Sequence, residues 1–511
     1  MAKPELDGAR FDLLVVGGGI NGTGIARDAA GRGVKVLLVE QDDLAAHTSS
    51  ASTKLIHGGL RYLEYYEFRL VRESLQERER LIHIAPHLSW PLQFVLPRPR
   101  GGRPGWMIRL GLWLYDHIGG HQSLPGSRGV DLRDPHWGAG LKPGLHRGFV
   151  YSDAWVDDAR LVVLNALDAA ERGAVILTGT ALTAARPDGD AWEVELAPNP
   201  SATGAPLAAP CRVRARTLVN AAGPWAGSLR DRLAGVQHDG GVTLVKGSHL
   251  IVPRLYPGDH AFLLQQDDGR IVFTIPYQGH FTLIGTTDVP VTEAERARPQ
   301  ISADEVSYLC AAVNGYFARP ITPADVVATY SGVRPLFDDG QSDAKAITRD
   351  YVLQLGRAAG PQVLNVFGGK LTTYRRLAEN ALDRLAPWLP ATATGAWTGS
   401  APLPGGDLPE GGFAAFLATM RGRWPFLPLD VAERMAHAYG TRIGQVLGAA
   451  TGWADLGEDF GSGLTAAELG YLVTQEWARS AQDILWRRTK IGLICTPETE
   501  RRVEAWLAAR G

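Results

Sequence analysis

Apolar and polar positions along the chain follow two spacings, which divide the sequence into strand-like and helix-like stretches. Residues 11–16 (FDLLVV) form a short apolar run with β-branched side chains, typical of a strand buried in a parallel sheet. Residues 21–32 are helix-like, and residues 34–40 (VKVLLVE) form a second buried strand that ends in an acid. This order predicts a strand–helix–strand unit at the start of the chain.

The middle of the chain predicts more helices and strands of the same kind. Residues 67–86 carry apolar side chains at positions 68, 70, 71, 75 and 81 among many charges, which indicates an exposed amphipathic helix. Residues 151–177 are typical of a helix followed by a strand, with Asp157 or Asp158 as the helix cap. Residues 217–220 are apolar and lead into small residues and glycine, as at the end of a buried strand.

The pattern changes twice more towards the C-terminus. Short apolar runs separated by turn residues occupy 242–288 and predict an antiparallel sheet. Residues 363–385 return to strand, glycine turn and helix. Residues 398–412 are rich in proline and glycine and indicate a linker, after which the spacing is mostly helical. A separate helical domain is therefore expected at the end of the chain.

Three glycines between the first strand and its helix, Gly17, Gly19 and Gly22, form the pattern G-x-G-x-x-G. The first permits a tight turn, the second lets backbone approach a pyrophosphate, and the third lets helix pack on strand. The helix N-terminus offers free N–H groups and a positive dipole end to the phosphates. Glu40, 18 residues after Gly22, is placed to bond a ribose hydroxyl. The alternative is a unit without a ligand. An acid at Glu40 disfavours NADP and leaves FAD and NAD.

Composition narrows the possible classes of protein. A length of 511 residues predicts two or three domains, and a formal net charge of −2 predicts no overall attraction to nucleic acid. Cys211, Cys310 and Cys495 lie far apart, which favours a reducing compartment and gives no metal-type spacing. Neither a signal peptide nor an apolar run of eighteen residues is recognisable, so we expect no spanning helix.

Four stretches carry a family resemblance: residues 15–33, 48–81, 330–336 (YSGVRPL) and 367–379 (FGGKLTTYRRLAE). Together they resemble the FAD-dependent, respiratory glycerol-3-phosphate dehydrogenases, which belong to the flavoproteins similar to D-amino-acid oxidase. The resemblance implies FAD as cofactor, oxidation of sn-glycerol 3-phosphate to dihydroxyacetone phosphate, and transfer of electrons to membrane quinone. It also implies a cytoplasmic protein held peripherally at the inner face of the cell membrane, and we expect a homodimer.

The predicted cofactor contacts come from four parts of the chain. They are the first glycine turn with its acid, the hydroxyl-rich stretch after it, the end of the strand at 217–220, and the second glycine turn. The predicted cofactor-binding residues are Gly17, Gly18, Gly19, Asn21, Gly22, Glu40, Thr48, Ser49, Ser50, Ser52, Lys54, Leu55, Gly58, Ala222, Gly223, Gly369, Lys370, Leu371 and Thr372.

Three cations in predicted turns are candidates for binding a phosphate: Arg61, Arg334 and Lys370. An arginine can hold phosphate through two hydrogen bonds, and a lysine that starts a helix opposes the dipole unless an anion lies nearby. A solvated surface cation is the alternative for each. The resemblance implies that all three line the substrate site, and we add Tyr62 and Thr373 as substrate contacts.

Two histidines are candidates for the base that removes the hydroxyl proton. His57 is the first choice because the resemblance places its segment against the flavin, and His249 is the second. A structural histidine bonded to backbone is the alternative for each. Arg334 is also assigned to the catalytic group.

Residues 81–115 contain no acid and hold an apolar, tryptophan-bearing segment. Four arginines accompany it: Arg98, Arg100, Arg103 and Arg109. A basic segment of this kind that is too short to span predicts an interfacial membrane contact. A buried helix preceded by a basic loop is the alternative.

The expected fold is α/β: a discontinuous Rossmann-like FAD-binding domain, an antiparallel-sheet substrate domain and a C-terminal helical cap. The predicted segments are 11–90, 149–228 and 329–390 for FAD binding, 91–148 for substrate or membrane contact, 229–328 for the substrate domain, 391–412 for the linker and 413–511 for the cap. Other functions remain open, namely a glycerol-3-phosphate oxidase that makes peroxide, an amine or amino-acid oxidase, or a flavoprotein without catalysis. A nicotinamide dehydrogenase is disfavoured because only one complete fingerprint is present.

Overall fold

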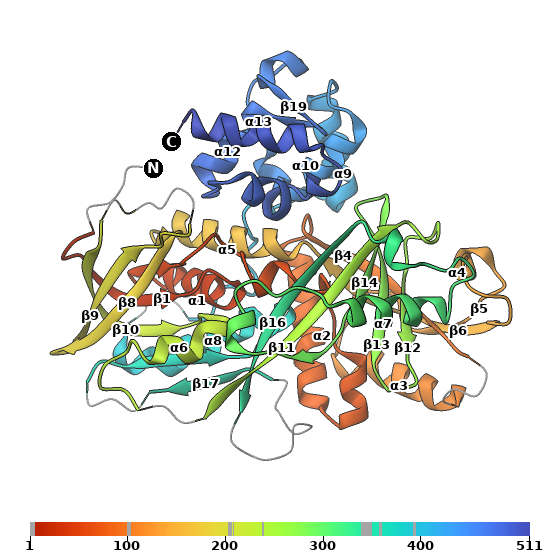
Figure 1. Ribbon diagram of the computed structural model, residues 1–511, viewed down its shortest axis with the longest axis horizontal. Helices are drawn as coiled ribbons and strands as arrows, with labels where there is room; N and C mark the ends of the chain where they lie inside the picture. Colours follow the sequence, from red (N-terminus) through yellow and green to blue (C-terminus); the bar gives the residue numbers. More distant parts are fainter. Residues whose placement is uncertain are drawn as a thin grey trace.

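The computed structural model describes residues 6–99, 104–202, 207, 209–237, 240–338, 350–356, 360–391 and 395–510. Two large sheets lie beside each other, and a helical domain packs against one side of them (Figure 1). The predicted mixture of a Rossmann-like sheet, an antiparallel sheet and a C-terminal helical domain is therefore confirmed.

The strands of the first sheet follow the order β17-β18-β10-β1-β2-β7. They are parallel except for β17, which lies antiparallel at one edge. An antiparallel pair, β8 and β9, joins the sheet through β10. Its strands are β1 Arg10–Val16, β2 Val36–Val39, β7 Val175–Leu177, β8 Thr180–Asp188, β9 Ala191–Pro198, β10 Cys211–Asn220, β17 Val352–Leu355 and β18 Val363–Phe367. The apolar runs predicted as buried strands form the centre of this sheet. Apolar side chains are needed there because both faces of the sheet are covered.

Three helices cover one face of this sheet: α1 Ile20–Gly31, α5 Asp158–Glu171 and α8 Tyr374–Leu385. Helix α1 packs between the other two. Asp157 caps α5 by accepting a hydrogen bond from the Arg160 N–H at 3.2 Å, so one of the two predicted caps is confirmed. Asp158 is fully buried and pairs with a lysine instead.

The second sheet runs β15-β11-β14-β13-β12-β4-β6-β3, with β16 added to β11 and β5 to β6. Its strands are β3 Leu55–Ile56, β4 Ser89–Pro97, β5 Arg128–Asp131, β6 Arg147–Val156, β11 Gly241–Pro253, β12 Ala261–Gln265, β13 Ile271–Tyr277, β14 Phe281–Gly285, β15 Val289–Pro290 and β16 Ala328–Asp338. Its pairs are antiparallel except β12 with β4. Strand β16, which falls within the segment 329–390, pairs with β11 over its whole length.

Further helices lie around the second sheet: α2 Phe68–Ile84, α3 Gly105–Ile118, α4 Pro135–Gly138 and α7 Ala303–Asn314. The short helix α6 Ala226–Arg230 contacts β18 of the first sheet and β11 of the second. The amphipathic helix predicted from residues 67–86 is α2, and its apolar stripe is buried except for Phe68. Among the described residues, no helix is both long enough and apolar enough to cross a membrane.

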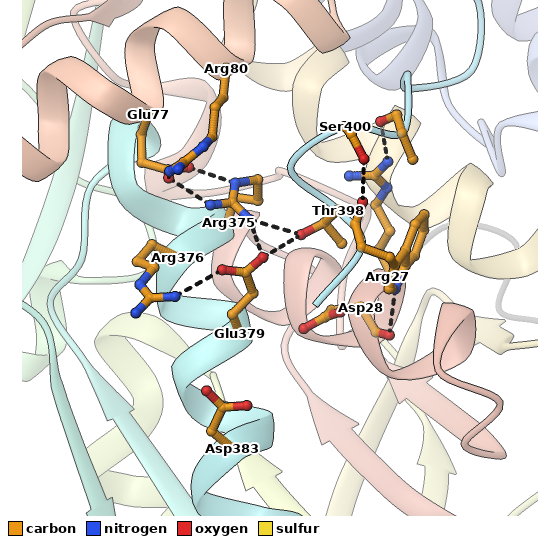
Figure 2. Close-up of polar contacts among 12 residues, drawn as sticks. Arg27, Asp28, Glu77, Arg80, Arg375, Arg376, Glu379, Asp383, Thr398 and Ser400 are labelled. Atoms are coloured by element: carbon orange, nitrogen blue, oxygen red, sulfur yellow. Dashed lines mark hydrogen bonds and ion pairs between the residues drawn. The ribbon is translucent and has the colours of Figure 1, made fainter. Parts of the chain in front are cut away.

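The C-terminal domain has its own apolar core and is helical, as predicted. Its elements are α9 Gly412–Arg423, α10 Leu429–Tyr439, α11 Ile443–Leu447, β19 Asp459–Gly461, β20 Leu464–Thr465, α12 Ala466–Gln475 and α13 Pro497–Ala508. The chain that leads into it is docked on the first domain (Figure 2). Arg375 of α8 bonds Thr398, and Arg27 of α1 donates to the carbonyl of Ala401 at 3.0 Å. The described part of the predicted linker is thus packed against helices.

Candidate functional site

A cavity of about 700 Å³ lies between the two sheets. Its wall begins at the ends of β1 and β2, passes residues 45–62, and reaches β11, β12, β13 and β16 of the second sheet. Ligands of open α/β sheets bind at such strand ends. The cavity is therefore lined both by residues predicted to bind the cofactor and by residues predicted to bind the substrate.

The first glycine turn has the geometry that its sequence predicts. Gly17 has a φ of +117°, and a methyl group there would overlap the carbonyl oxygen of Ala221. A methyl at Gly22 would overlap the carbonyl oxygen of Gly17, so helix and strand pack too closely for any side chain. Helix α1 begins at Ile20 with its N-terminus at the cavity wall. The turn thus presents a helix dipole to any anion in the cavity.

Glu40 lies at the end of β2 and lines the cavity. Its carboxylate accepts hydrogen bonds from the N–H groups of Gly18 at 2.6 Å and Asp42 at 2.8 Å. Burial raises the pKa of Glu40 despite these donors.

Glu40, Asp42 and His47 each bring a ligand atom within 4.8 Å of the others. The backbone donors and the His47–Asp42 pair at 2.7 Å already use these atoms, so the group does not require a metal.

The hydroxyl-rich segment crosses from the first sheet to the second. Thr48 donates to the carbonyl of Val333 on β16 at 2.6 Å, and Ser49 accepts from the N–H of Ile20 at 3.0 Å. Ser52 donates to Asp158 at 2.8 Å. The segment is therefore held at both ends while its inner side faces the cavity.

Lys54 does not face the main cavity, which corrects its prediction as a cofactor contact. Its ammonium group lies 2.7 Å and 2.8 Å from the two carboxylate oxygens of Asp158, and it also donates to the carbonyl of Ser50. The lysine is 2% exposed, and a buried cation requires a buried counter-charge. Lys54 thus holds the segment on the side that faces away from the main cavity.

The second glycine turn meets the first across the cavity. Gly368 and Gly369 have φ values of +67° and +89°, and Asn21 of α1 donates to the carbonyl of Gly368 at 3.1 Å. Lys370 and Leu371 follow the turn and line the cavity. Two elements almost 350 residues apart in sequence are thereby joined at one point.

The three candidate phosphate-binding cations line the same cavity. Arg334 lies 2.8 Å from the carboxylate of Asp288. The ammonium of Lys370 lies 3.8 Å from the ring centre of Tyr62. Arg61 donates to the hydroxyl of Tyr65 at 3.3 Å. Three separate elements thus bring three positive charges to the wall of one cavity.

Both candidate histidines line the cavity as well. His249 on β11 bonds Thr53 at 3.0 Å and stacks on Tyr330, with 4.7 Å between ring centres. Burial, and then the charges of Lys54 and Arg334, lower the pKa of His249 to about 3. Burial, and then the charge of Lys370, lower the pKa of His57 to about 4. Both rings are therefore neutral at pH 7 and can accept a proton.

Most of the predicted site residues belong to the cavity wall, and six do not. Those in the wall are Gly17, Gly19, Asn21, Glu40, Thr48, Ser49, Ser52, Leu55, His57, Arg61, Tyr62, Ala222, Gly223, His249, Arg334, Gly369, Lys370, Leu371 and Thr372. Those outside it are Gly18, Gly22, Ser50, Lys54, Gly58 and Thr373. Gly58 is held behind the wall, where its N–H donates to the hydroxyl of Tyr115 at 2.8 Å.

Sequence patterns missed several residues that the fold brings to the cavity. They are His47, Tyr151, Thr180, Leu182, Trp225, Arg232, Leu263, Arg270, Phe273, Thr286, Asp288 and Gly332. Arg270 is an additional cation, paired with Asp268 at 2.7 Å and stacked over Tyr308. It stands in the turn DDGR, whose residue types indicate a turn and give no separate sign of a binding role. Asp288 has no motif-like neighbours that would mark it.

Comparison with known proteins finds two family models along the chain. A family model described as FAD dependent oxidoreductase matches residues 12–375, and one described as C-terminal domain of alpha-glycerophosphate oxidase matches residues 396–508. The chain is 50% identical to D-erythritol 1-phosphate dehydrogenase of Brucella abortus over 98% of its own length and 97% of that protein. It is also 50% identical to glycerol-3-phosphate dehydrogenase of Pseudomonas aeruginosa, over 97% and 95%.

A solved structure is similar over nearly the whole chain. The glycerol-3-phosphate dehydrogenase from Bacillus halodurans, complexed with FAD, superposes with a TM-score of 0.75 at 27% identity, covering 99% of this chain and 95% of that one. The similarity therefore includes both sheets and the C-terminal domain.

Proposed function

Since the chain belongs to the FAD-dependent oxidoreductase family, we propose that it oxidises sn-glycerol 3-phosphate to dihydroxyacetone phosphate and passes the electrons to a membrane quinone. One observation carries this proposal: Arg61, Arg334 and Lys370 surround the cavity that also contains the glycine turn and two neutral histidines. A single carboxylate, as in an amino-acid substrate, needs fewer cations than a phosphate dianion.

The cavity has the features that FAD requires. The close approach at Gly17, the N-terminus of α1 and the buried acid Glu40 suit a pyrophosphate and a ribose, and they lie along one wall. Residues 48–53 and the turn at Gly369 would contact the rest of the cofactor. When bound, FAD supplies the hydride acceptor for alcohol oxidation.

The side chains divide the remaining chemistry between them. The arginines and Lys370 hold the phosphate dianion through charge-assisted hydrogen bonds. A neutral imidazole, His57 or His249, takes the proton of the substrate hydroxyl as the hydride leaves carbon. A methyl at Gly285 would overlap the ring of His249, so the sheet leaves space for this ring beside the cavity. Separate replacement of each histidine by Asn identifies the base, because loss of the base lowers kcat far more than loss of its neighbour.

The substrate is tested with purified, FAD-loaded protein without oxygen. Glycerol 3-phosphate should bleach the flavin absorbance quickly, glycerol should bleach it only slowly and at much higher concentration, and glycine should not bleach it. D-Erythritol 1-phosphate belongs in the same assay because a relative named for it is 50% identical. Both compounds are phosphorylated polyols that three cations can bind. Bleaching by an amino acid and by neither phosphate would refute the proposal.

The electron acceptor is tested separately. The reduced enzyme should reduce a soluble quinone quickly and make little peroxide in air. Rapid peroxide formation with slow quinone reduction would instead identify a glycerol-3-phosphate oxidase.

A membrane contact is proposed for the exposed face of α3 and the chain before α2. Trp106, Leu110 and Trp113 are 69%, 57% and 52% exposed, and Tyr66 is 80% exposed. Aromatic side chains of this kind sit at membrane interfaces. Arg109 donates to the carbonyl of Ser127 at 2.7 Å. Arg100 and Arg103 lie outside the described residues.

Liposome flotation tests this contact. The double variant Trp106→Ser and Trp113→Ser should lose liposome binding, whereas Trp388→Ser, a matched change of an exposed tryptophan on another element, should retain it. Equal binding of both variants would contradict the proposal. The homodimer also stays a prediction, which sedimentation of the detergent-free protein tests.

A further inference from the structure

We propose that the C-terminal helical domain is a clamp that positions the cofactor-binding segment, residues 41–54, through Arg487, Arg488 and Lys490. The inference rests on FAD binding in the main cavity, as proposed above. It gives these three cations, which do not line the main cavity, the role of positioning residues.

The first attachment is to Asp43, three residues after Glu40. Arg488 donates from two nitrogens to the two oxygens of Asp43, at 2.7 Å and 2.8 Å. Arg487 adds a third hydrogen bond at 2.7 Å. Arg488 is 0% exposed. Burial alone would raise the pKa of Asp43, but the charges of Arg488 and Arg487 outweigh it and lower the pKa. The carboxylate is thus held in its charged form by the other domain.

The second attachment runs through Asp158. Lys490 lies 3.6 Å from the carboxylate of Asp158, which in turn binds Lys54 and the hydroxyl and N–H of Ser52. Lys54 has a φ of +59°, a conformation that costs free energy for a residue with a side chain. Its ammonium also donates to the carbonyl of Ser50. The charge of Lys490 therefore reaches the segment through a single shared carboxylate.

The space between the segment and the domain shows why these ion pairs matter. A second cavity of about 330 Å³ separates them. Thr48, Ser50 and Lys54 line one side of it, and Trp486 and Lys490 line the other. Where this cavity lies the two sides are not in contact, so the ion pairs through Asp43 and Asp158 are the contacts that link the segment to these three cations. The opposite side of the same segment faces the main cavity.

The domain is also anchored by contacts that do not involve the segment, and Arg488 takes part in one of them by donating to the carbonyl of Glu476 at 2.7 Å. Arg160 of α5 pairs with Glu476 and donates to the carbonyl of Ala438 at 2.7 Å. In the connecting chain, Trp397 donates to the carbonyl of Asp28 at 3.1 Å, beside the contacts drawn in Figure 2. These contacts hold the domain to α1 and α5, so it is a fixed support against which the segment can be set.

The test compares two paired arginines in the full-length protein. Arg488→Gln removes the ion pair with Asp43 of the segment together with a hydrogen bond to the carbonyl of Glu476. Arg434→Gln removes an ion pair with Glu468, 2.6 Å long, that lies inside the C-terminal domain. For each variant, FAD affinity is measured by quenching of flavin fluorescence, and the melting temperature is measured without added FAD. The visible circular dichroism of bound flavin reports its surroundings.

Arg488→Gln should weaken FAD binding about tenfold, within the range by which indirect contacts couple to a site, and should change the flavin circular dichroism. Arg434→Gln should lower the melting temperature by a similar amount and leave both flavin readouts unchanged. Arg488→Lys should restore part of the affinity. Equal FAD affinity in the two Gln variants would overturn the proposal.

If Arg488→Gln does not fold, Lys490→Gln decides the question, because its ion pairs are longer and its loss is less disruptive. It should weaken FAD binding about threefold, and wild-type affinity and spectrum would overturn the clamp. FAD affinity is measured without substrate, so a failure of the proposed reaction leaves this result intact.

Discussion

Replacement of Arg334 by Gln should impair substrate binding and leave the stability of the protein nearly unchanged. Arg334 pairs with Asp288 at 2.8 Å, but the two side chains are 44% and 46% exposed. Ion pairs this exposed contribute about 0–1 kcal/mol to the free energy of unfolding. The variant should therefore melt within about 4 °C of the wild type.

The effect on catalysis should be far larger. A hydrogen bond to a charged group is worth about 1.5–3 kcal/mol, which corresponds to roughly a 10- to 150-fold loss of kcat/KM. The loss should appear with glycerol 3-phosphate and be absent with glycerol, because glycerol has no phosphate for Arg334 to hold. Steady-state kinetics with a soluble quinone measure both.

Arg212→Gln is the matched control. Arg212 forms a similarly exposed pair with Glu195 at 3.0 Å, at side-chain exposures of 58% and 38%, and does not line the cavity. It should leave kcat/KM unchanged. Equal losses with glycerol and glycerol 3-phosphate, or a kcat/KM within threefold of the wild type, would refute a phosphate contact by Arg334.

Four further predictions concern the site. A plot of kcat/KM against pH should show one acid limb near pH 6, set by the substrate phosphate. His57 and His249 should add no second limb there, because their pKa values are about 4 and 3. A slope of two between pH 5 and 7 would contradict this. These depressed pKa values also predict that thermal stability falls as pH drops below about 6.5, since only the unfolded chain takes up the protons there. Gly22→Ala should abolish FAD retention, because the added methyl overlaps the carbonyl oxygen of Gly17; FAD content after gel filtration checks it. Lys54→Met should cost about 3–5 kcal/mol, the range for leaving a buried charge unpaired, and an unchanged urea midpoint would show that the pair contributes nothing.

Local sequence was sufficient for elements whose burial pattern is complete within a short stretch. Residues 11–40 carry two apolar runs, a glycine turn and a terminal acid, and they form β1, α1, β2 and Glu40 as expected. The same holds for α2 and for the helical C-terminal domain. In each case the spacing of apolar residues shows which face of the element is buried. Few backbone conformations place all of those residues on one face.

Position in a sheet was less predictable than the presence of a strand. The strand at 328–338 has no local feature that assigns it to one sheet, and it pairs with β11, some eighty residues earlier. Thr180 and Leu182 reach the cavity because β8 joins β9 and β10 at the edge of the first sheet. Partner choice depends on long-range packing, which periodicity does not encode.

The sequence by itself determined the nature of the cofactor turn, because Gly17, Gly22 and Glu40 act within one strand–helix–strand unit. Only the tertiary structure decided the role of Lys54. Its residue type and neighbours suit a phosphate contact, yet Asp158, 104 positions later, lies beside it. A buried ammonium goes where a buried carboxylate can balance it, because desolvation of either charge alone is too costly. The same reason brings Arg488 of the last domain to Asp43 of the first.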